Sequence, residues 1–340
     1  MGERRRLWAL DGLRGLAALA VVAYHYLDRG PQLYPELGHA HSWIEWGQYG
    51  VQLFFIISGF VIFDSVKSST TGHFFANRAI RLYPAYWLAV FLTFTVVLFF
   101  GLPGRETSLL VALFNLTMLE GFFGIPYVDG AYWTLAIELA FYVSIAVLAR
   151  IGALADGRLI TTLFVWIAAV LAMRGIGLVF HGNPVIDMLD GIASWLPLFV
   201  VGIALNIGHK SGRWIAPVAV IICAVAVTAS RGLAVLPPLI VATALVVAAI
   251  VVRIPQGVRP FSNFLGELSY PVYLLHQNIG YVLLLWLASA GVPQLGAVAI
   301  TAAVAISIGT IAAYAFDIPV RSRLRAALAS RSALQPKRHG

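Results

Sequence analysis

The stretch Leu233–Val252 reads LAVLPPLIVATALVVAAIVV and carries no charged side chain over 20 residues. An α-helix needs about 20 consecutive apolar residues to cross the hydrocarbon core of a bilayer. The rest of the chain has the same character, because 60% of its 340 residues are hydrophobic and only 11% are charged. This composition excludes a soluble enzyme, a disordered regulator and a disulfide scaffold. It predicts an all-α integral membrane protein that crosses the membrane several times.

Similar runs divide the chain into ten candidate membrane helices, so we expect a bundle of about ten. The apolar segment at residues 109–119 has about half the length of a crossing, and we expect it to be interfacial or re-entrant. The ten candidates lie at residues 7–27, 47–66, 80–101, 131–150, 159–180, 188–208, 213–229, 233–252, 268–290 and 295–318.

The basic residues test this count. Ten helices place 18 Lys and Arg residues on one side of the membrane and only Arg29, Arg105 and Arg231 on the other. Because positive charge collects in cytoplasmic loops, both termini are predicted to be cytoplasmic. The net charge of +8 is then explained by topology and anionic lipid headgroups, with no nucleic-acid partner. We expect residues 1–319 to form the membrane domain and residues 320–340 a short basic cytoplasmic tail.

Ionisable side chains inside a bilayer are costly and are therefore candidates for function. The first helix has three: Asp11, Arg14 and His25. At about 100° per residue, all three point within about 40° of one direction, so they share a helix face. The alternative is structural, an ion pair between Asp11 and Arg14 with a single interfacial histidine.

Two arginines, Arg78 and Arg81, open the third candidate helix. At a spacing of three residues they share a helix face and can form a double fork for phosphate. The alternative is a pair of anchors at a cytoplasmic boundary, which the composition favours when taken alone.

Two further helices contribute ionisable groups. Glu138 lies about two turns inside the fourth helix, at a depth compatible with His25, and a buried structural carboxylate is the alternative reading. In the ninth helix Tyr273 and His276 share a face, where a hydrogen-bonded packing histidine is the favoured reading. Asp11, Arg14, His25 and Glu138 together would also suit a proton-coupled secondary transporter.

In combination, these segments resemble the membrane acyltransferases of family 3, which O-acylate surface glycans and some antibiotics. The similarity runs in order from residue 10 to about residue 280, and five motifs together make it specific. The motifs are LDGLRG at 10–15 with His25, FFIISGF at 54–60, RAIRLYP at 78–84, WTL at 133–135 with Glu138, and SYPVYLLH at 269–276.

The resemblance implies transfer of an acyl group, usually acetyl from acetyl-CoA, to a hydroxyl. It implies that Arg14 and His25 are required, and that Arg78 and Arg81, with Tyr83 beside them, serve the acyl-CoA donor. Acyl-CoA would be a co-substrate, and we expect no tightly bound cofactor and no metal.

A mechanism follows from this resemblance and the expected topology. His25 would act as general base with Glu138 orienting its imidazole, and the acceptor would be a glycan, a lipid-linked saccharide or a macrolide. The expected location is the bacterial cytoplasmic membrane. Supporting roles are expected for Asp11, Ser58, Trp133, Tyr273 and His276.

Overall fold

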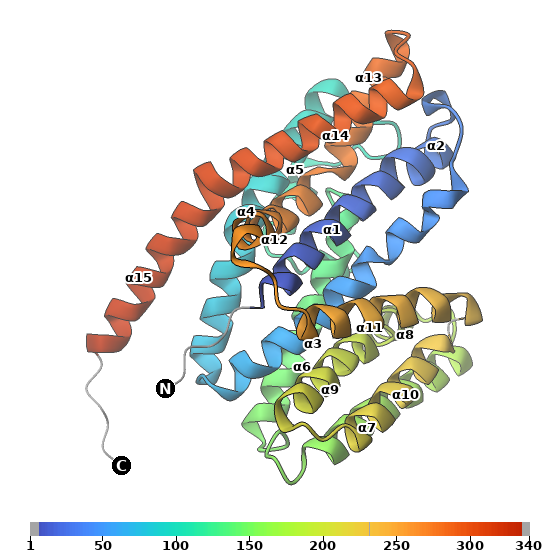
Figure 1. Ribbon diagram of the computed structural model, residues 1–340. Helices are drawn as coiled ribbons and strands as arrows, with labels where there is room; N and C mark the ends of the chain where they lie inside the picture. The colour runs from blue at the N-terminus through green and yellow to red at the C-terminus, as the bar shows by residue number, and fades with distance from the viewer. Residues whose placement is uncertain (1–6, 231, 335–340) are drawn as a thin grey trace.

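The structure is a computed structural model that describes residues 7–230 and 232–334, and every regular element within them is a helix (Figure 1). This confirms the all-α class. Seven helical stretches are long and apolar enough to cross a membrane, or eight if one strongly bent pair counts as a single span. The prediction of ten adds two helices that fall short of this measure, α1 (Trp8–Tyr24) and α10 (Ile215–Ala229), and it stays a prediction.

Some of these apolar stretches include more than one of the helical elements. The remaining helices are α2 (Gly30–Leu33), α3 (Gly50–Lys67), α4 (Thr71–Phe100), α5 (Leu109–Asn115), α6 (Trp133–Arg150), α7 (Leu159–Val179), α8 (Pro184–Ala193), α9 (Leu196–Ser211), α11 (Leu236–Val251), α12 (Arg259–Leu275), α13 (Gln277–Ser289), α14 (Gln294–Ile311) and α15 (Ile318–Leu334).

Close backbone approaches hold the centre of the bundle together. A Cβ at Gly15 of α1 would lie 2.7 Å from the carbonyl oxygen of Leu265, so only glycine lets α1 contact α12 in this way. Gly59 of α3 and Gly202 of α9 face each other's helices with the same restriction. Small residues that let helix backbones touch are the usual basis of packing in membranes, where lipid is as apolar as the side chains. The two contacts fix α1 and α3 relative to the helices around them.

The third candidate helix begins earlier than predicted. We expected residues 80–101, whereas α4 begins at Thr71, after the side chain of Thr70 accepts a hydrogen bond from the backbone N–H of His73. The hydrophobicity pattern missed this part because its first turns are polar. Arg78 and Arg81 therefore lie inside α4, about two turns from its start, and do not open it.

The ninth candidate helix is broken. We expected a single helix over residues 268–290, but α12 and α13 meet at His276 and are bent by 68°. Tyr26 donates a hydrogen bond from its hydroxyl to the carbonyl oxygen of His276 at 2.7 Å, and so stabilises the break. The bend places a buried histidine at the junction of two helices and turns α13 toward α1 and α4.

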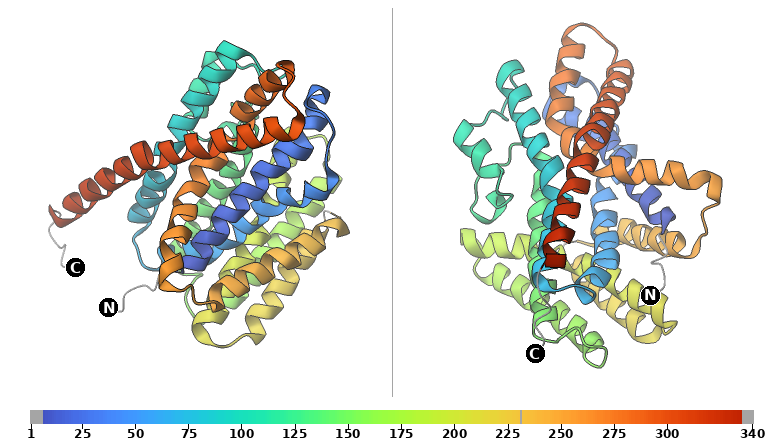
Figure 2. Two further views of the ribbon diagram at one scale, coloured as in Figure 1. Left: turned by 45° about the horizontal axis from the view of Figure 1, so that its top comes forward. Right: turned by 90° about the vertical axis from the view of Figure 1, so that its left-hand side faces the viewer.

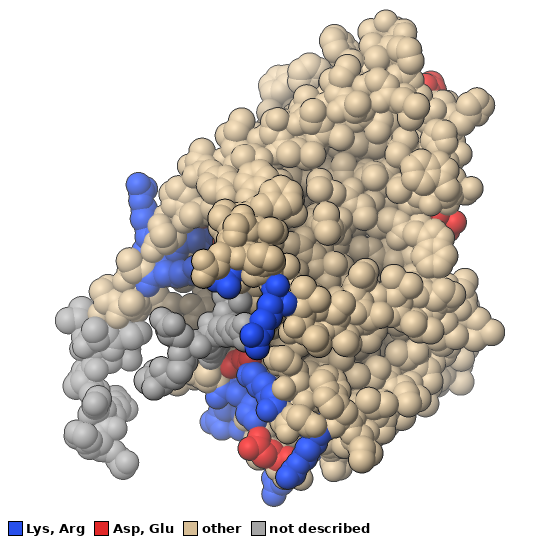
Figure 3. Space-filling view, viewed as in Figure 1, with Lys and Arg blue, Asp and Glu red and all other residues tan. Residues whose placement is uncertain are grey.

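The last helix continues past residue 319, through a π-helical turn at Ala312–Asp317 into α15. Arg321 on α15 pairs with Glu267 of α12 at 2.7 Å, which ties the helix to the bundle. In the left view of Figure 2, α15 extends beyond the rest of the molecule. On the face shown in Figure 3, Lys and Arg gather where α15 ends and α1 begins, and we refer to this as the basic end.

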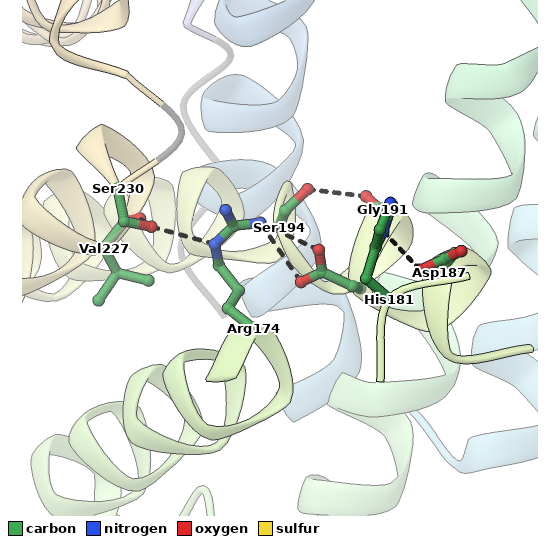
Figure 4. Close-up of polar contacts among 8 residues, drawn as sticks. Arg174, His181, Asp187, Gly191, Ser194, Val227 and Ser230 are labelled. Atoms are coloured by element: carbon green, nitrogen blue, oxygen red, sulfur yellow. Dashed lines mark hydrogen bonds and ion pairs between the residues drawn. The ribbon is translucent and has the colours of Figure 1, made fainter. Parts of the chain in front are cut away.

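Arg174, the arginine inside the fifth candidate helix, is paired. Its Nη1 lies 3.3 Å from a carboxylate oxygen of Asp190 on α8, and its Nε donates to the hydroxyl of Ser230 at 3.0 Å (Figure 4). Gly177, one turn further along α7, leaves room for Asp190, because a Cβ there would lie 3.0 Å from its Cγ. The charge is thus neutralised by a neighbour within the helical bundle.

Candidate active site

The polar face predicted for the first helix runs past three separate cavities. Asp11 lines a cavity of about 910 Å³ at the basic end. Arg14 lines a small cavity of about 60 Å³ between α1, α3, α6 and α12. His25 lines a cavity of about 530 Å³ at the opposite end of α1. We call these the basic-end, middle and His25 cavities.

His25 lies where α1 changes to a π-helical turn, His25–Arg29. Such turns re-aim side chains and are frequent at functional sites. The Nδ1 atom of His25 lies 2.8 Å from the carbonyl oxygen of Val21 and 3.2 Å from the Nε2 atom of His276. His276 is fully buried, and its Nδ1 lies 2.8 Å from the carbonyl oxygen of Tyr273. The bend between α12 and α13 therefore brings the two imidazoles together.

The carbonyl partners assign the protons of this pair. A carbonyl oxygen only accepts, so Nδ1 of His276 donates to Tyr273 and, in the neutral ring, Nε2 of His276 is an acceptor. By the same reasoning Nδ1 of His25 donates to Val21, and its hydrogen is shared with Nε2 of His276. The Nε2 atom of neutral His25 is left with a lone pair. The pair thus provides a base on a side chain that lines the 530 Å³ cavity.

Glu138 is not brought to His25. Its Oε1 accepts hydrogen bonds from the hydroxyls of Tyr142 at 2.5 Å and Ser58 at 3.3 Å, and it lines the middle cavity with Arg14. Its place in an apolar stretch predicted how far along the helix Glu138 lies, but not the direction of its side chain about the helix axis. The predicted orienting contact from Glu138 to His25 is absent from the described structure, and His276 occupies that place.

Arg78 and Arg81 have unsatisfied nitrogens. The Nε atom of Arg78 and an Nη atom of Arg81 are buried without a hydrogen-bond partner among the described residues. The Arg81 guanidinium lies 5.5 Å from the ring centroid of Tyr270, which also lines the middle cavity. Buried guanidinium nitrogens without partners are costly. The arrangement is therefore suited to an anion that has yet to bind.

Of the other predicted site residues, Tyr83 holds a loop in place, whereas Trp133 and Tyr273 line cavities. The hydroxyl of Tyr83 donates to the carbonyl oxygen of Thr117 at 2.8 Å, so this side chain ties α4 to the following loop. Trp133 stacks obliquely on Trp195, with ring centroids 5.0 Å apart, and both line the His25 cavity. Tyr273 lines both the middle cavity and the His25 cavity, and its hydroxyl donates to the carbonyl oxygen of Ala131 at 3.1 Å.

Sequence reasoning missed Asp129, which lies in the loop before α6 and is fully buried. Its carboxylate accepts hydrogen bonds from the backbone N–H groups of Ala131 and Asn278, both at 2.9 Å. Burial raises the pKa of Asp129 to about 6, although the two N–H donors oppose this shift. Because Asn278 is two residues after His276, Asp129 anchors the start of α13 beside the imidazole pair. An acidic residue before a helix was the available signal, since it also marks an ordinary N-terminal cap.

Comparison with known proteins supports the residue-level resemblance. The acyltransferase family 3 model, described as an acyltransferase domain, matches residues 7–316. The acyltransferase MdmB of Streptomyces mycarofaciens is 30% identical over 313 residues, which cover 80% of this chain and 78% of MdmB. Nodulation protein 10 of Rhizobium leguminosarum bv. viciae is 26% identical over 275 residues, covering 69% and 72% of the two chains.

A third relative matches over a shorter stretch. The peptidoglycan O-acetyltransferase OatA of Listeria monocytogenes is 28% identical over 160 residues, covering 41% of this chain and 24% of OatA. No solved structure matches the chain. Since the family model spans nearly the whole membrane domain, the chain belongs to acyltransferase family 3 and is a multi-pass membrane O-acyltransferase.

Proposed function

We propose that this enzyme moves an acyl group, acetyl in the first instance, from acyl-CoA to a hydroxyl of a glycan, a lipid-linked saccharide or a macrolide-type acceptor, with His25 as the general base. The observation that carries the proposal is the His25–His276 pair beside the 530 Å³ cavity. A base must lie within reach of the proton that it removes and must be unprotonated beforehand. In the neutral His25 ring, the hydrogen bond from Nδ1 to the carbonyl oxygen of Val21 leaves Nε2 without a proton.

The transfer step then balances as follows. Nε2 of His25 takes the proton of the acceptor hydroxyl while the hydroxyl oxygen attacks the thioester carbonyl carbon. The C–S bond breaks, the CoA thiolate leaves, and it takes the proton from the imidazolium. During this step Nε2 of His276 accepts the hydrogen bond from Nδ1 of His25, so it holds the ring in place as the carboxylate does in a catalytic triad.

A continuous series of side chains supports the donor route. Acyl-CoA is polar and cannot enter from lipid, so its phosphates would bind Arg78 and Arg81 in the cytoplasm-facing half of α4. Arg81 lies over Tyr270, which lines the middle cavity together with Arg14 and Glu138. At about 60 Å³, this cavity is smaller than the few hundred Å³ that a ligand arm of this kind needs. The acyl arm therefore has to displace side chains, among them Tyr273, to reach His25.

The orientation is part of the same proposal. The basic end faces the cytoplasm of a bacterial cell, where acyl-CoA is made, and the His25 cavity opens toward the other side of the cytoplasmic membrane. Ten crossings with both termini cytoplasmic agree with the common end of α1 and α15. Membership in an acyltransferase family favours this reading of the intramembrane charges over proton-coupled transport.

The test is direct. Purified, monodisperse protein is incubated with acetyl-CoA and a panel of hydroxyl-bearing acceptors, and mass spectrometry of the products looks for the acetyl increment. The His25→Ala variant is the negative control. We expect CoA release and at least one acetylated product with the wild type only. A folded wild-type protein that neither releases CoA nor acetylates any acceptor contradicts the proposal.

A further inference from the structure

The His25 cavity contains two arginines that the transfer step does not use. Arg29 follows His25 by one turn, and Arg105 comes from the loop between α4 and α5. Only three basic residues were assigned by sequence to this side of the membrane, and these are two of them. Positive charge is disfavoured there by topology, so the meeting of both guanidinium groups at one cavity needs another explanation.

The position of Arg105 is fixed by the chain around it. Leu102 is fully buried in a hydrophobic cluster, and the hydroxyl of Tyr34 donates to the carbonyl oxygen of Pro103 at 3.1 Å. Gly101 and Gly104 adopt positive φ angles of 71° and 73°, which give the loop its sharp turns. Arg105 is half-buried as a result, and so is unlike a freely solvated loop arginine.

No carboxylate forms an ion pair with either group among the described residues. None of the described residues that line the His25 cavity is acidic. The nearby acids have other partners: Asp28 accepts from Gln32, and Asp129 accepts from two backbone N–H groups. The described lining of the cavity therefore contains two guanidinium groups and no carboxylate.

A second feature of the cavity indicates a hydroxyl-rich ligand. Gln52 lines it and is only 3% exposed, and its Oε1 atom is buried without a hydrogen-bond partner among the described residues. An unsatisfied buried acceptor is costly, and a ligand hydroxyl would satisfy it. Two tryptophans, Trp133 and Trp195, supply flat apolar faces in the same cavity. Aromatic walls with a few convergent polar groups are typical of a small-molecule site.

We infer that the acceptor is an anionic saccharide, one that carries a phosphate or carboxylate within reach of the hydroxyl to be acylated. Arg29 and Arg105 bind the anion, Gln52 accepts a hydrogen bond from a neighbouring hydroxyl, and the tryptophans contact the sugar ring. This inference rests on the proposed function, because it assigns the His25 cavity to the acceptor. It narrows the acceptor from any hydroxyl compound to a charged one.

The test measures binding without turnover. Equilibrium dialysis of the full-length protein in detergent uses radiolabelled glucose 1-phosphate, glucuronate and glucose at one ionic strength. We expect both anions to bind at least about tenfold more tightly than glucose, as charge-assisted hydrogen bonds predict. The Arg29→Gln/Arg105→Gln double variant should lose the preference, and Arg29→Lys/Arg105→Lys should retain part of it. Arg158→Gln is the matched control, since Arg158 is exposed and lines none of the three cavities.

Three results would overturn the inference. The first is that the anions bind no more tightly than glucose, and the second is that the preference for anions survives in the double Gln variant. The third is that equimolar phosphatidylglycerol in the micelles displaces glucose 1-phosphate, which would identify a lipid headgroup site. Acetyl-CoA turnover is measured separately on the same preparation. Binding of the anions without any turnover would contradict the proposed function and support only an anion-binding site at Arg29 and Arg105. Turnover without a preference for anions would contradict the inference and leave the proposed function standing.

Discussion

The Nε2 atom of His276 lies 3.2 Å from the Nδ1 atom of His25, across the junction where α12 ends and α13 begins. The two residues are 251 positions apart in the sequence. In this contact His25 donates the hydrogen bond and His276 accepts it. Replacing His25, the proposed base, should therefore affect activity differently from replacing His276, which holds the base in place. The first two predictions use that difference.

Removing the base should stop turnover without preventing donor binding. We expect His25→Ala to lower kcat by at least about 100-fold, the lower range for general-base catalysis, with acetyl-CoA binding nearly unchanged. The measurement is acetyl transfer, or CoA release, by detergent-purified protein. A folded variant with most of its turnover would remove His25 from the mechanism.

Removing the orienting ring should be milder. We expect His276→Ala to lower kcat by about tenfold to 100-fold and to leave the KM for acetyl-CoA nearly unchanged, since the base remains but is no longer held. His276→Gln should recover part of the loss, because its amide oxygen can accept the hydrogen bond from His25. Steady-state kinetics separate kcat from KM. Equal activities for the Ala and Gln variants would show that His276 only fills space.

The arginine pair should affect the donor. Arg78→Ala and Arg81→Ala should each raise the KM for acetyl-CoA, through loss of charge-assisted contacts of about 1.5–3 kcal/mol each. Lysine replacements should recover only part of the affinity, because a point charge cannot reproduce the two-nitrogen fork. Titration calorimetry with CoA is the measurement, and Arg158→Ala is the control. Unchanged affinity in both alanine variants would mean that these arginines only anchor the helix.

Asp129 predicts a pH dependence of stability. Its pKa is raised from 3.8 to about 6, so between these values the folded protein binds a proton that the unfolded chain has lost. Stability from this group is therefore present at low pH, falls as pH rises from about 4 to about 6, and is constant above that. Two pKa units correspond to about 3 kcal/mol.

The check is thermal unfolding of the wild type and Asp129→Asn across this pH range. The variant should be less stable at low pH, because one amide oxygen cannot replace two carboxyl oxygens that bond Ala131 and Asn278. The difference between the two unfolding curves should shrink as pH rises. A difference that is constant with pH would show that Asp129 does not titrate in this range.

The sequence predicted the helical class and singled out residues that line the three cavities, but not how those residues meet. Asp11, Arg14 and His25 do lie on one helix, as the spacing indicated, yet each lines a different cavity because other helices cross between them. The position of Glu138 along its helix was predicted from its place in an apolar stretch. The direction in which its side chain points about the helix axis could not be predicted in this way. The break at His276 has no local signal strong enough to end a helix, since Pro271 lies well inside α12.

Tyr273 belongs to both the middle cavity and the His25 cavity, and this has a consequence for the two substrates. Under the proposed function the donor arrives through the middle cavity and the acceptor through the His25 cavity, so Tyr273 would separate the two substrates. The Tyr273 hydroxyl donates to the carbonyl oxygen of Ala131 and lies 3.1 Å from the Thr134 hydroxyl, so the ring is held between the two cavities. On the proposed donor route, movement of this ring would have to accompany every passage of the acyl arm, as with a gating side chain.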